Sequence, residues 1–155
     1  MQIFPLKTAI LENNFNFQKI LVDSLKNLSL QFQDGDILII ASKIVALSQG
    51  RLLKITEDSG QSQNDDDVFK KIVEKEADFI SPYNDWLTLK DGIFIANAGI
   101  DKSNVPDGFC VLWPEKSYEF ADNLCVDLKK KYNLKNLGIV ICDSQVTPLR
   151  RGVTG

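Results

Sequence analysis

The chain has 155 residues, of which 44% are hydrophobic and 25% charged, and this composition predicts one globular domain with a substantial core. A net charge of −3 and an isoelectric point near 5.0 argue against a nucleic-acid binder, because phosphate contacts need clustered Lys and Arg. The sequence contains no histidine, which excludes Ser-His-Asp and Cys-His catalysis and histidine-ligated zinc and leaves carboxylates, lysines, hydroxyls, backbone amides and bound cations.

Two elements are predicted before residue 30. Residues 2–4 have the composition of a short strand, which Pro5 would end. From Phe17 onward the apolar residues recur at helical spacing, and Asn16 is a suitable N-cap. We therefore expect an amphipathic helix that packs on a sheet.

The run from Asp36 to Ala41 is a continuous apolar stretch typical of a strand covered on both faces. Ser42 and Lys43 follow it directly. A lysine just past a buried strand can meet a phosphate or a carboxylate, or it can be a solvated residue at the start of a helix. Residues 44–51 fit either a short helix or a second strand.

The segment from about residue 56 to residue 67 is polar and acidic, and we expect it to be a mobile surface loop or lid. Its last residues, Asp65, Asp66 and Asp67, favour the start of a helix, where negative charge complements the helix dipole. Consecutive side chains on a helix do not converge, so a helix start is favoured over a metal site. The apolar face of this helix would extend to Ile80.

Residues 87–96 predict a β-hairpin with Asp91 and Gly92 in its turn. The loop that follows, Asn97 to Asn104, reads Asn-Ala-Gly-Ile-Asp-Lys-Ser-Asn. Polar side chains on a loop mounted on a buried strand often carry chemistry, but Asn, Gly, Asp and Ser are also ordinary turn residues. Both interpretations remain open on these residues alone.

The last third of the chain predicts a strand, a helix and a strand. Residues 108–113 are an apolar strand, and Ser117 is a suitable N-cap for the following helix. Residues 137–142 form the final strand, which delivers Asp143 and Ser144 at its carboxyl end. The cysteines match no zinc-binding spacing, and we expect reduced core residues at Cys110, Cys125 and Cys142.

Asp101 and Asp143 occupy equivalent positions, each after an apolar strand of one expected sheet. Ligands gather beyond the carboxyl ends of strands in open α/β sheets, and a divalent cation removes the repulsion between two carboxylates. Magnesium held by one or two carboxylates usually also contacts substrate phosphates, which suggests a nucleotide or a phosphorylated substrate. The sequence has no Walker loop and no dinucleotide fingerprint. The alternative is that the two aspartates are unrelated turn residues.

Several segments together resemble one family, the coenzyme F-420-0: L-glutamate ligases, of which the chain looks like a divergent and truncated N-terminal portion. The resemblance implies an α/β (α+β) fold with a mixed β-sheet and covering helices, one domain over residues 1–155, a longer parent chain and a homodimer. The segments that carry it are residues 35–45, Gly50 with Arg51, residues 97–106, residues 141–144, and Pro148, Arg150 and Gly152.

The resemblance implies a γ-glutamyl ligase that uses GTP and Mg²⁺ or Mn²⁺ to add L-glutamate to coenzyme F-420-0 or a related carboxylate acceptor through an acyl phosphate. The partners would then be a nucleotide and a small carboxylate acceptor. No apolar run approaches the roughly 20 residues of a membrane span and no signal peptide is visible, so we expect a cytoplasmic protein without a membrane or nucleic-acid partner. The implied site residues are Asp101, Asp143 and Ser144 for the metal, and Ser42, Lys43 and Asn104 for the nucleotide.

This chain departs from the family pattern at several positions. Leu47 stands where the family usually has a lysine expected to face the nucleotide, and Asn13 and Asn14 replace an acidic pair. A different acceptor is therefore one open alternative. Another is a non-catalytic homologue that binds a nucleotide or another ligand, or pairs with itself.

Overall fold

The computed structural model of the chain describes residues 2–8, 10–55, 65–144 and 151. These residues form two compact units. The first contains the chain up to Gly50 together with Pro114–Ser144, and the second contains Arg51–Trp113. The expectation of one domain over residues 1–155 stays a prediction.

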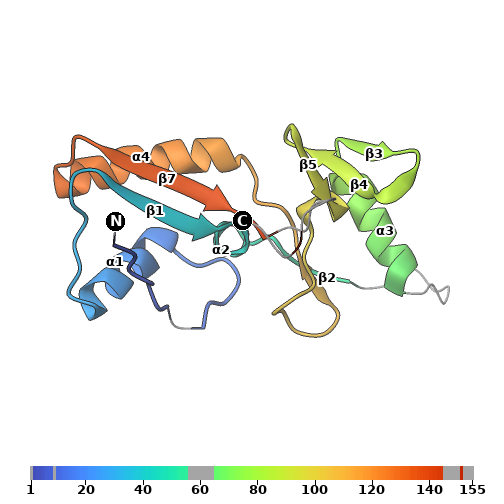
Figure 1. Cartoon of the computed structure of the whole chain (residues 1–155). Helices are drawn as coiled ribbons and strands as arrows, with labels where there is room; N and C mark the ends of the chain where they lie inside the picture. Colours follow the sequence, from blue (N-terminus) through green and yellow to red (C-terminus); the bar gives the residue numbers. More distant parts are fainter. Residues whose placement is uncertain (1, 9, 56–64, 145–150, 152–155) are drawn as a thin grey trace. The chain divides into compact units, whose positions relative to one another are not determined.

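The first unit is built on two parallel strands, β1 (Asp36–Ala41) and β7 (Leu137–Cys142), which pair in register along their whole length (Figure 1). The bounds of both strands are those predicted from their apolar runs. Two helices, α1 (Phe17–Asn27) and α4 (Ser117–Tyr132), pack with this sheet. The buried core consists of Leu21, Leu25, Leu38, Ile40, Val45, Leu124 and Leu128.

The helix α1 begins as predicted. The side chain of Asn16 accepts a hydrogen bond from the backbone N–H of Lys19 at 2.9 Å, which satisfies one of the free donors of the first turn. Residues 2–4, in contrast, do not form the predicted strand. Ile3 is 80% exposed, so this segment lacks the burial that a strand of this composition would gain from a sheet.

The helix α2 (Ser42–Ser48) begins immediately after β1 and resolves the ambiguity over residues 44–51 in favour of a helix. It ends at Gln49, and Gly50 follows with φ of 75°, the left-handed conformation that commonly closes a helix. The short strand β2 (Leu52–Lys54) comes next, in the second unit.

The burial of β1 differs from the prediction of a strand covered on both faces. Leu38 and Ile40 are buried, but Ile37 and Ile39 are 65% and 66% exposed. Only one face of β1 is covered by the residues that the structure describes. The apolar run identified the strand correctly, but it carried no information about what covers its second face.

The start of α4 lies one residue earlier than predicted. Lys116 is the N-cap, in a left-handed conformation with φ of 47°, and it makes no side-chain capping bond. Ser117, predicted as the cap, is the first helical residue and is buried. The left-handed turn at Lys116 sets the direction of the helix without a hydroxyl cap.

The second unit contains a three-stranded antiparallel sheet of β3 (Phe79–Ser81), β4 (Asn84–Lys90) and β5 (Ile93–Ala96), and a separate pair of β2 with β6 (Phe109–Val111). Asp91 and Gly92 have φ of 51° and 77°, as a type I′ hairpin turn requires, which confirms the predicted hairpin. The core includes side chains from α3 (Asp65–Glu76) and is formed by Phe69, Val73, Ala98, Ile100, Cys110 and Leu112.

The predicted extent of the acidic segment and of its helix needs one correction. Residues 56–64 lie outside the described residues, and Asp65 begins α3 as expected. The helix ends at Glu76, so Ile80 is not on its apolar face but in β3. A three-residue strand is too short to show an alternating pattern, and the helical periodicity before it extended across Ile80.

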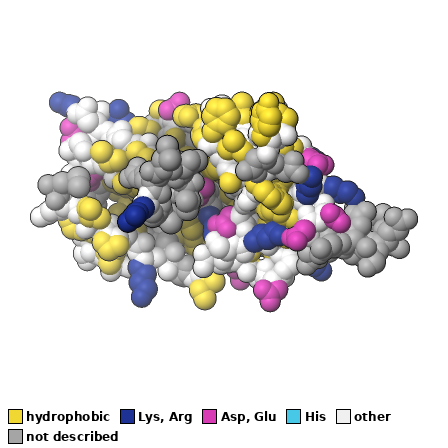
Figure 2. Space-filling model, turned by 45° about the vertical axis from the view of Figure 1, so that its right-hand side comes forward, with side chains coloured by type: hydrophobic (Ala, Val, Ile, Leu, Met, Phe, Trp, Pro, Cys, Tyr) yellow, Lys and Arg dark blue, Asp and Glu magenta, His cyan; other side chains and the backbone are white. Residues whose placement is uncertain are grey.

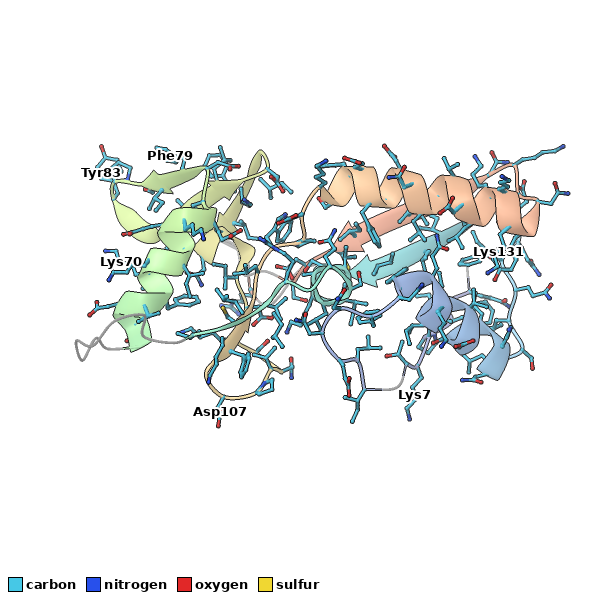
Figure 3. All side chains as sticks on the ribbon, turned by 180° about the vertical axis from the view of Figure 1, so that it is seen from behind. Lys7, Lys70, Phe79, Tyr83, Asp107 and Lys131 are labelled. Atoms are coloured by element: carbon cyan, nitrogen blue, oxygen red, sulfur yellow. The ribbon has the colours of Figure 1, made fainter. Side chains whose placement is uncertain are left out.

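One face of the three-stranded sheet is apolar and exposed; we call it the outer sheet face. Phe79, Leu89 and Phe94 lie opposite one another across the three strands, and Leu87 lies opposite Ala96. Phe79, Leu87 and Phe94 are 52%, 45% and 68% exposed. Figure 2 shows hydrophobic side chains gathered at the top of the view, and Figure 3 labels Phe79.

The α/β fold class with helices and mixed sheets is confirmed, but the strands do not form one sheet. The strand β5 that precedes Asp101 belongs to the three-stranded sheet, whereas the strand β7 that precedes Asp143 pairs with β1. The expectation that both aspartates follow strands of a single sheet is therefore wrong. In the described part of the chain, no helix is long and apolar enough to cross a membrane.

Candidate functional site

The carboxyl ends of β1 and β7 bring Ser42 and Asp143 together. Ala41 lies opposite Cys142 in the parallel register, so the next residue of each strand leaves the sheet at the same level. Ser42 Oγ donates a hydrogen bond to Asp143 Oδ1 at 2.9 Å. Because Ser42 is buried and sits in the first turn of α2, this bond orients the half-buried carboxylate of Asp143.

Lys43 and Ser144 accompany this pair in sequence. Lys43 is half-buried in the first turn of α2, and Ser144 is exposed directly after Asp143. Leu47 follows Lys43 by four residues and therefore shares a face of α2 with it. The position where the resemblance expects a second lysine thus lies on the lysine-bearing face and holds an apolar side chain.

The loop that begins at Asn97 is a turn of left-handed residues. Asn97, Ala98 and Gly99 have φ of 54°, 52° and 73°. The buried hydroxyl of Thr88 fixes the turn, because Thr88 Oγ1 accepts from the Ala98 N–H at 2.7 Å and donates to the Ile95 carbonyl at 2.5 Å. A Cβ on Gly99 would lie 2.3 Å from Trp113 Cε3, so only glycine fits at this position.

Asp101 is held by its backbone and by its own loop. Its N–H and carbonyl pair with Val111 at 2.9 and 2.8 Å, which ties the loop to β6. The N–H and hydroxyl of Ser103 donate to its carboxylate at 2.6 and 2.9 Å. Asn104 is exposed, with φ of 58°. The carboxylate of Asp101 therefore has a defined orientation within the second unit.

The predicted site residues divide between the two units. Ser42, Lys43, Asp143 and Ser144 are in the first, and Asp101 and Asn104 are in the second. Ser42 and Asp143 are in direct contact, whereas a metal shared by Asp101 and Asp143 stays a prediction. Within residues 2–8, 10–55, 65–144 and 151, no group of three or more Asp, Glu or Cys residues is placed to hold a metal ion.

The donor atoms nevertheless fit the cations that the resemblance implies. Asp143 and Ser144 offer a carboxylate and a hydroxyl in one unit, and Asp101 offers a carboxylate in the other. These are hard oxygen ligands, which suit Mg²⁺ and Mn²⁺. A site with few carboxylates is what Mg²⁺ uses when substrate phosphates complete its coordination.

An open depression of about 470 Å³, which we call the loop pocket, lies beside the Asn97 turn in the second unit. Sequence analysis did not identify it. Phe69 is one of the apolar positions of the helix predicted to start near Asp65, and Trp86 has no feature in the sequence that distinguishes it from a core residue. The only signal was Asn97, as the first residue of the quoted loop. The side chains that line the pocket include Phe69, Trp86, Asn97, Ile100, Asp101 and Lys102.

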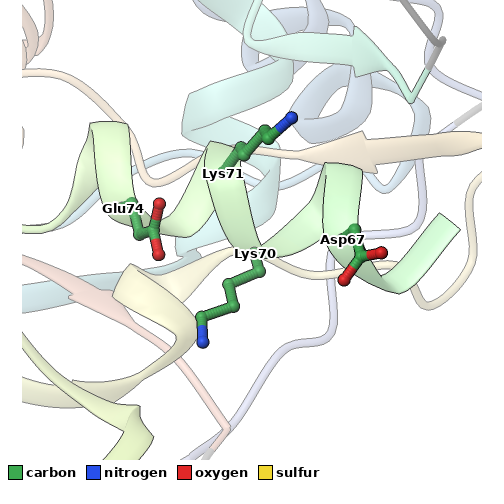
Figure 4. Close-up of a pocket in the computed structure, with 4 residues that line it drawn as sticks. All are labelled: Asp67, Lys70, Lys71 and Glu74. Carbon is green, nitrogen blue, oxygen red and sulfur yellow. The ribbon is translucent and has the colours of Figure 1, made fainter. Parts of the chain in front are cut away.

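A second depression, on the exposed side of α3, is lined by charged side chains of one helix (Figure 4). Asp67 precedes Lys70 and Lys71 by three and four residues, and these lysines precede Glu74 by four and three. Opposite charges at these spacings support an exposed helix. We interpret this surface as the solvated face of α3 rather than as a ligand site.

Arg51, which belongs to a segment carrying the family resemblance, has a structural role. Its Nη2 lies 2.6 Å from Glu76 Oε2, and its Nε donates to the carbonyl of Trp113 at 3.1 Å. Lys90 Nζ is 3.9 Å from the same Glu76 oxygen. These contacts join the start of β2, the end of α3 and the end of β4.

The cysteines are free thiols, in agreement with the expectation of reduced residues. Cys110 is buried, and burial raises the pKa of its thiol, because an apolar environment disfavours the thiolate. Cys125 and Cys142 are half-buried, so the expectation of core positions holds fully only for Cys110.

Comparison with known proteins agrees with the resemblance. A family model described as F420-0:gamma-glutamyl ligase matches residues 5–155. The chain is similar to proteins named coenzyme F420:L-glutamate ligase from three archaea. The one from Methanopyrus kandleri is 28% identical over 82% of this chain and 54% of the relative. The one from Methanothermobacter thermautotrophicus is 26% identical over 88% and 58%, and the one from Methanosarcina mazei is 30% identical over 79% and 52%. The chain thus spans about half the length of these relatives.

Proposed function

Because the chain belongs to the F420-0:gamma-glutamyl ligase family, we propose that it forms part of an enzyme that joins L-glutamate to a carboxylate acceptor at the expense of GTP. The acceptor is coenzyme F420-0 or a related carboxylate. The observation that carries this proposal is the contact between Ser42 and Asp143 at the carboxyl ends of two adjacent parallel strands. This is the place where α/β sheets gather ligands.

The proposed reaction has two steps. A carboxylate oxygen of the acceptor attacks the γ-phosphorus of GTP, and GDP leaves, which produces an acyl phosphate. The amine of glutamate then attacks the acyl carbon, loses a proton to solvent and displaces phosphate, which forms the amide. The overall change is carboxylate, amine and GTP to amide, GDP and phosphate.

The proposed roles follow the chemistry of the side chains. Asp143, Ser144 and Asp101 hold Mg²⁺ or Mn²⁺, which neutralises phosphate charge when bound. Lys43 and Asn104 position the nucleotide, and Lys43 adds positive charge near its phosphates. Ser42 contributes to the nucleotide site and orients the Asp143 carboxylate through its hydrogen bond.

A second candidate is a non-catalytic homologue that binds a nucleotide or another ligand. The observation that favours it is Leu47, which places an apolar side chain on the face of α2 that also carries Lys43. Loss of one cation from a nucleotide site weakens the stabilisation of phosphoryl transfer more directly than it prevents binding.

Release of GDP distinguishes the two candidates. The full-length protein is incubated with GTP, Mn²⁺, L-glutamate and candidate acceptors, and nucleotide binding is measured in parallel. Under the ligase proposal, GDP release requires both glutamate and an acceptor, and Asp143→Asn and Asp101→Asn abolish it together with Mn²⁺ binding. The exposed Asp107, close in sequence to the Asn97–Asn104 loop, provides the matched control Asp107→Asn (Figure 3). Binding of GTP without release for any acceptor supports the non-catalytic candidate.

We also propose a homodimer, formed through the outer sheet face. Its side chains are uncharged and apolar, although an exposed sheet face normally carries polar residues. Exposed apolar patches commonly mark interfaces. An apolar sheet face can pack against its own copy across a two-fold axis, because the same surface serves both partners.

A further inference from the structure

The wall of the loop pocket is aromatic. Phe69 from α3 and Trp86 from β4 have ring centroids 6.1 Å apart and planes inclined by 31°. Phe69 is buried, and Lys102 Nζ lies 3.9 Å from its ring centroid, so one face of this ring is covered. Trp86 is 44% exposed and lines the pocket. Part of its indole surface is therefore in contact with solvent.

Asn97, which also lines the pocket, carries a buried acceptor. Asn97 Oδ1 is buried and has no hydrogen-bond partner among the residues that the structure describes. Such an acceptor is costly unless a donor satisfies it. The backbone of Asn97 is in the left-handed region, which asparagine adopts more readily than most residues, so the cost at this point is the unsatisfied oxygen. A ligand that brings an N–H to this oxygen removes that cost.

The charges around the pocket disfavour a ligand that is only a phosphate. The carboxylates of Asp66 and Asp101 line it, against the single ammonium of Lys102. Without a cation on Asp101, two negative groups repel a phosphate more than one lysine attracts it. The part of a ligand that fits the wall and the acceptor is therefore an uncharged planar ring.

We infer that the loop pocket binds a planar nitrogen heterocycle, stacked on Trp86, whose ring N–H donates to Asn97 Oδ1. Its volume of about 470 Å³ is within the range of small-molecule sites. Stacking on an aromatic side chain tolerates different rings, because each has a π-face. Two ligands of the proposed reaction contain a ring with an N–H: the nucleotide, through its guanine, and the acceptor, through its deazaflavin. The identity of the ring rests on that function, whereas the pocket and its acceptor do not.

The test measures ring binding without turnover. Calorimetric titrations use the full-length protein without metal or glutamate, and the probes are guanosine and a 5-deazaflavin without a carboxylate chain. Trp86→Leu is expected to weaken binding of the preferred ring by about tenfold, since stacking is lost. Asn97→Gly removes the acceptor and keeps a residue suited to the left-handed backbone, and it is expected to weaken binding of the same ring.

Tyr83→Leu is the matched control, because Tyr83 is an aromatic residue of the same unit, 96% exposed and outside the pocket lining (Figure 3). It is expected to change the affinity by less than about twofold, as a surface substitution away from the site. Circular dichroism checks that each variant is folded.

Tighter binding of guanosine assigns the pocket to the nucleotide base, and tighter binding of the deazaflavin assigns it to the acceptor; both support the inference. It is overturned if the folded wild-type protein binds neither ring, or if Trp86→Leu binds as Tyr83→Leu does. GDP release is measured separately. Ring binding without GDP release contradicts the proposed ligase activity but not the proposed pocket. If neither ring binds and Trp86→Leu leaves GDP release unchanged, the pocket is contradicted but the ligase activity is not.

Discussion

Ser42 Oγ donates a hydrogen bond to Asp143 Oδ1 across 2.9 Å, although 101 positions separate the two residues in the chain. Parallel pairing of β1 with β7 makes this contact possible, because Ala41 and Cys142 end the two strands opposite each other. Ser42 is buried, and its hydroxyl donates this hydrogen bond in a fixed direction. Ser42 is therefore a positioning residue for the Asp143 carboxylate, whatever that carboxylate binds.

The first prediction concerns Ser42→Ala. Loss of the hydrogen bond frees the carboxylate of Asp143 to rotate, and on the proposed function Mn²⁺ affinity falls by about tenfold, as for other groups that orient metal ligands. Ser48→Ala is the matched control, because Ser48 Oγ bonds the carbonyl of Val45 at 2.6 Å within the same helix. Titration with Mn²⁺ followed by electron paramagnetic resonance measures both. Equal affinities for the two variants would contradict a positioning role.

The site residues of the first unit could be predicted because each follows a long apolar run, which is a local feature of the sequence. Apolar runs gave both bounds of β1 and of β7, and the residues after each run were named as candidates. The apolar runs did not predict that these two strands pair with each other. Pairing depends on contacts between residues about a hundred positions apart, and periodicity within one segment carries no information about them.

The surroundings of Asp101 and Asn104, in the second unit, were predicted less well. The Asn97 loop was identified, but β3 was merged with the preceding helix and the strands before Asp101 and Asp143 were placed in one sheet. Three-residue strands are too short for an alternating pattern. The loop pocket was missed because Phe69 and Trp86 converge only through packing of α3 on β4, and each residue alone is an ordinary apolar position.

Gly99→Ala tests the turn that carries the loop. An added Cβ would lie 2.3 Å from Trp113 Cε3, and φ is +73°. We expect a loss of roughly 2–5 kcal/mol of unfolding free energy, from backbone strain of about 1–2 kcal/mol and overpacking of about 1–3 kcal/mol. At Gly92, φ is +77° and no atom lies within 4 Å of an added Cβ. The Gly92→Ala variant should therefore show the backbone strain alone. Urea unfolding measures both, and equal losses would show that the contact with Trp113 is unimportant.

Glu76→Gln tests the ion pairs of the second unit. The change removes the charge that pairs with Arg51 at 2.6 Å and with Lys90 at 3.9 Å, at a side chain only 14% exposed. We expect a loss of about 1–3 kcal/mol in unfolding free energy, because a largely buried guanidinium loses its partner. Glu119→Gln breaks an exposed pair with Lys116 and should cost less than about 0.5 kcal/mol. Similar losses for both variants in urea unfolding would argue against the burial effect.

Asp34 predicts a pH dependence. The backbone N–H of Asn136 at 2.6 Å, its side-chain amide at 3.0 Å and the N–H of Lys135 at 2.7 Å lower the pKa of the Asp34 carboxyl below its ordinary value of 3.8. A pKa lowered on folding stabilises the protein above the unfolded-state value, and this stability is lost as the pH falls through the folded value.

The corresponding variant is Asp34→Asn. It should be less stable than the wild type at pH 7. The difference should begin to shrink below about pH 3.8, where the carboxyl of the unfolded wild-type chain takes up a proton, and should be lost as the pH falls through the lowered pKa of the folded carboxyl. Urea unfolding at pH 7 and at pH 3 measures the two differences. A difference that stays constant between these values would show that the charge of Asp34 does not contribute.

The outer sheet face makes the last prediction. Phe94 is 68% exposed at one end of a row with Leu89 and Phe79, so Phe94→Lys places a charge within the proposed interface between two copies. We expect a dimer for the wild-type protein in sedimentation velocity and a monomer for this variant, because an unpaired charge is costly in an apolar interface. Tyr83→Lys, on the turn between β3 and β4, should leave the dimer intact. A wild-type monomer, or a dimer that persists in Phe94→Lys, would contradict the proposed interface.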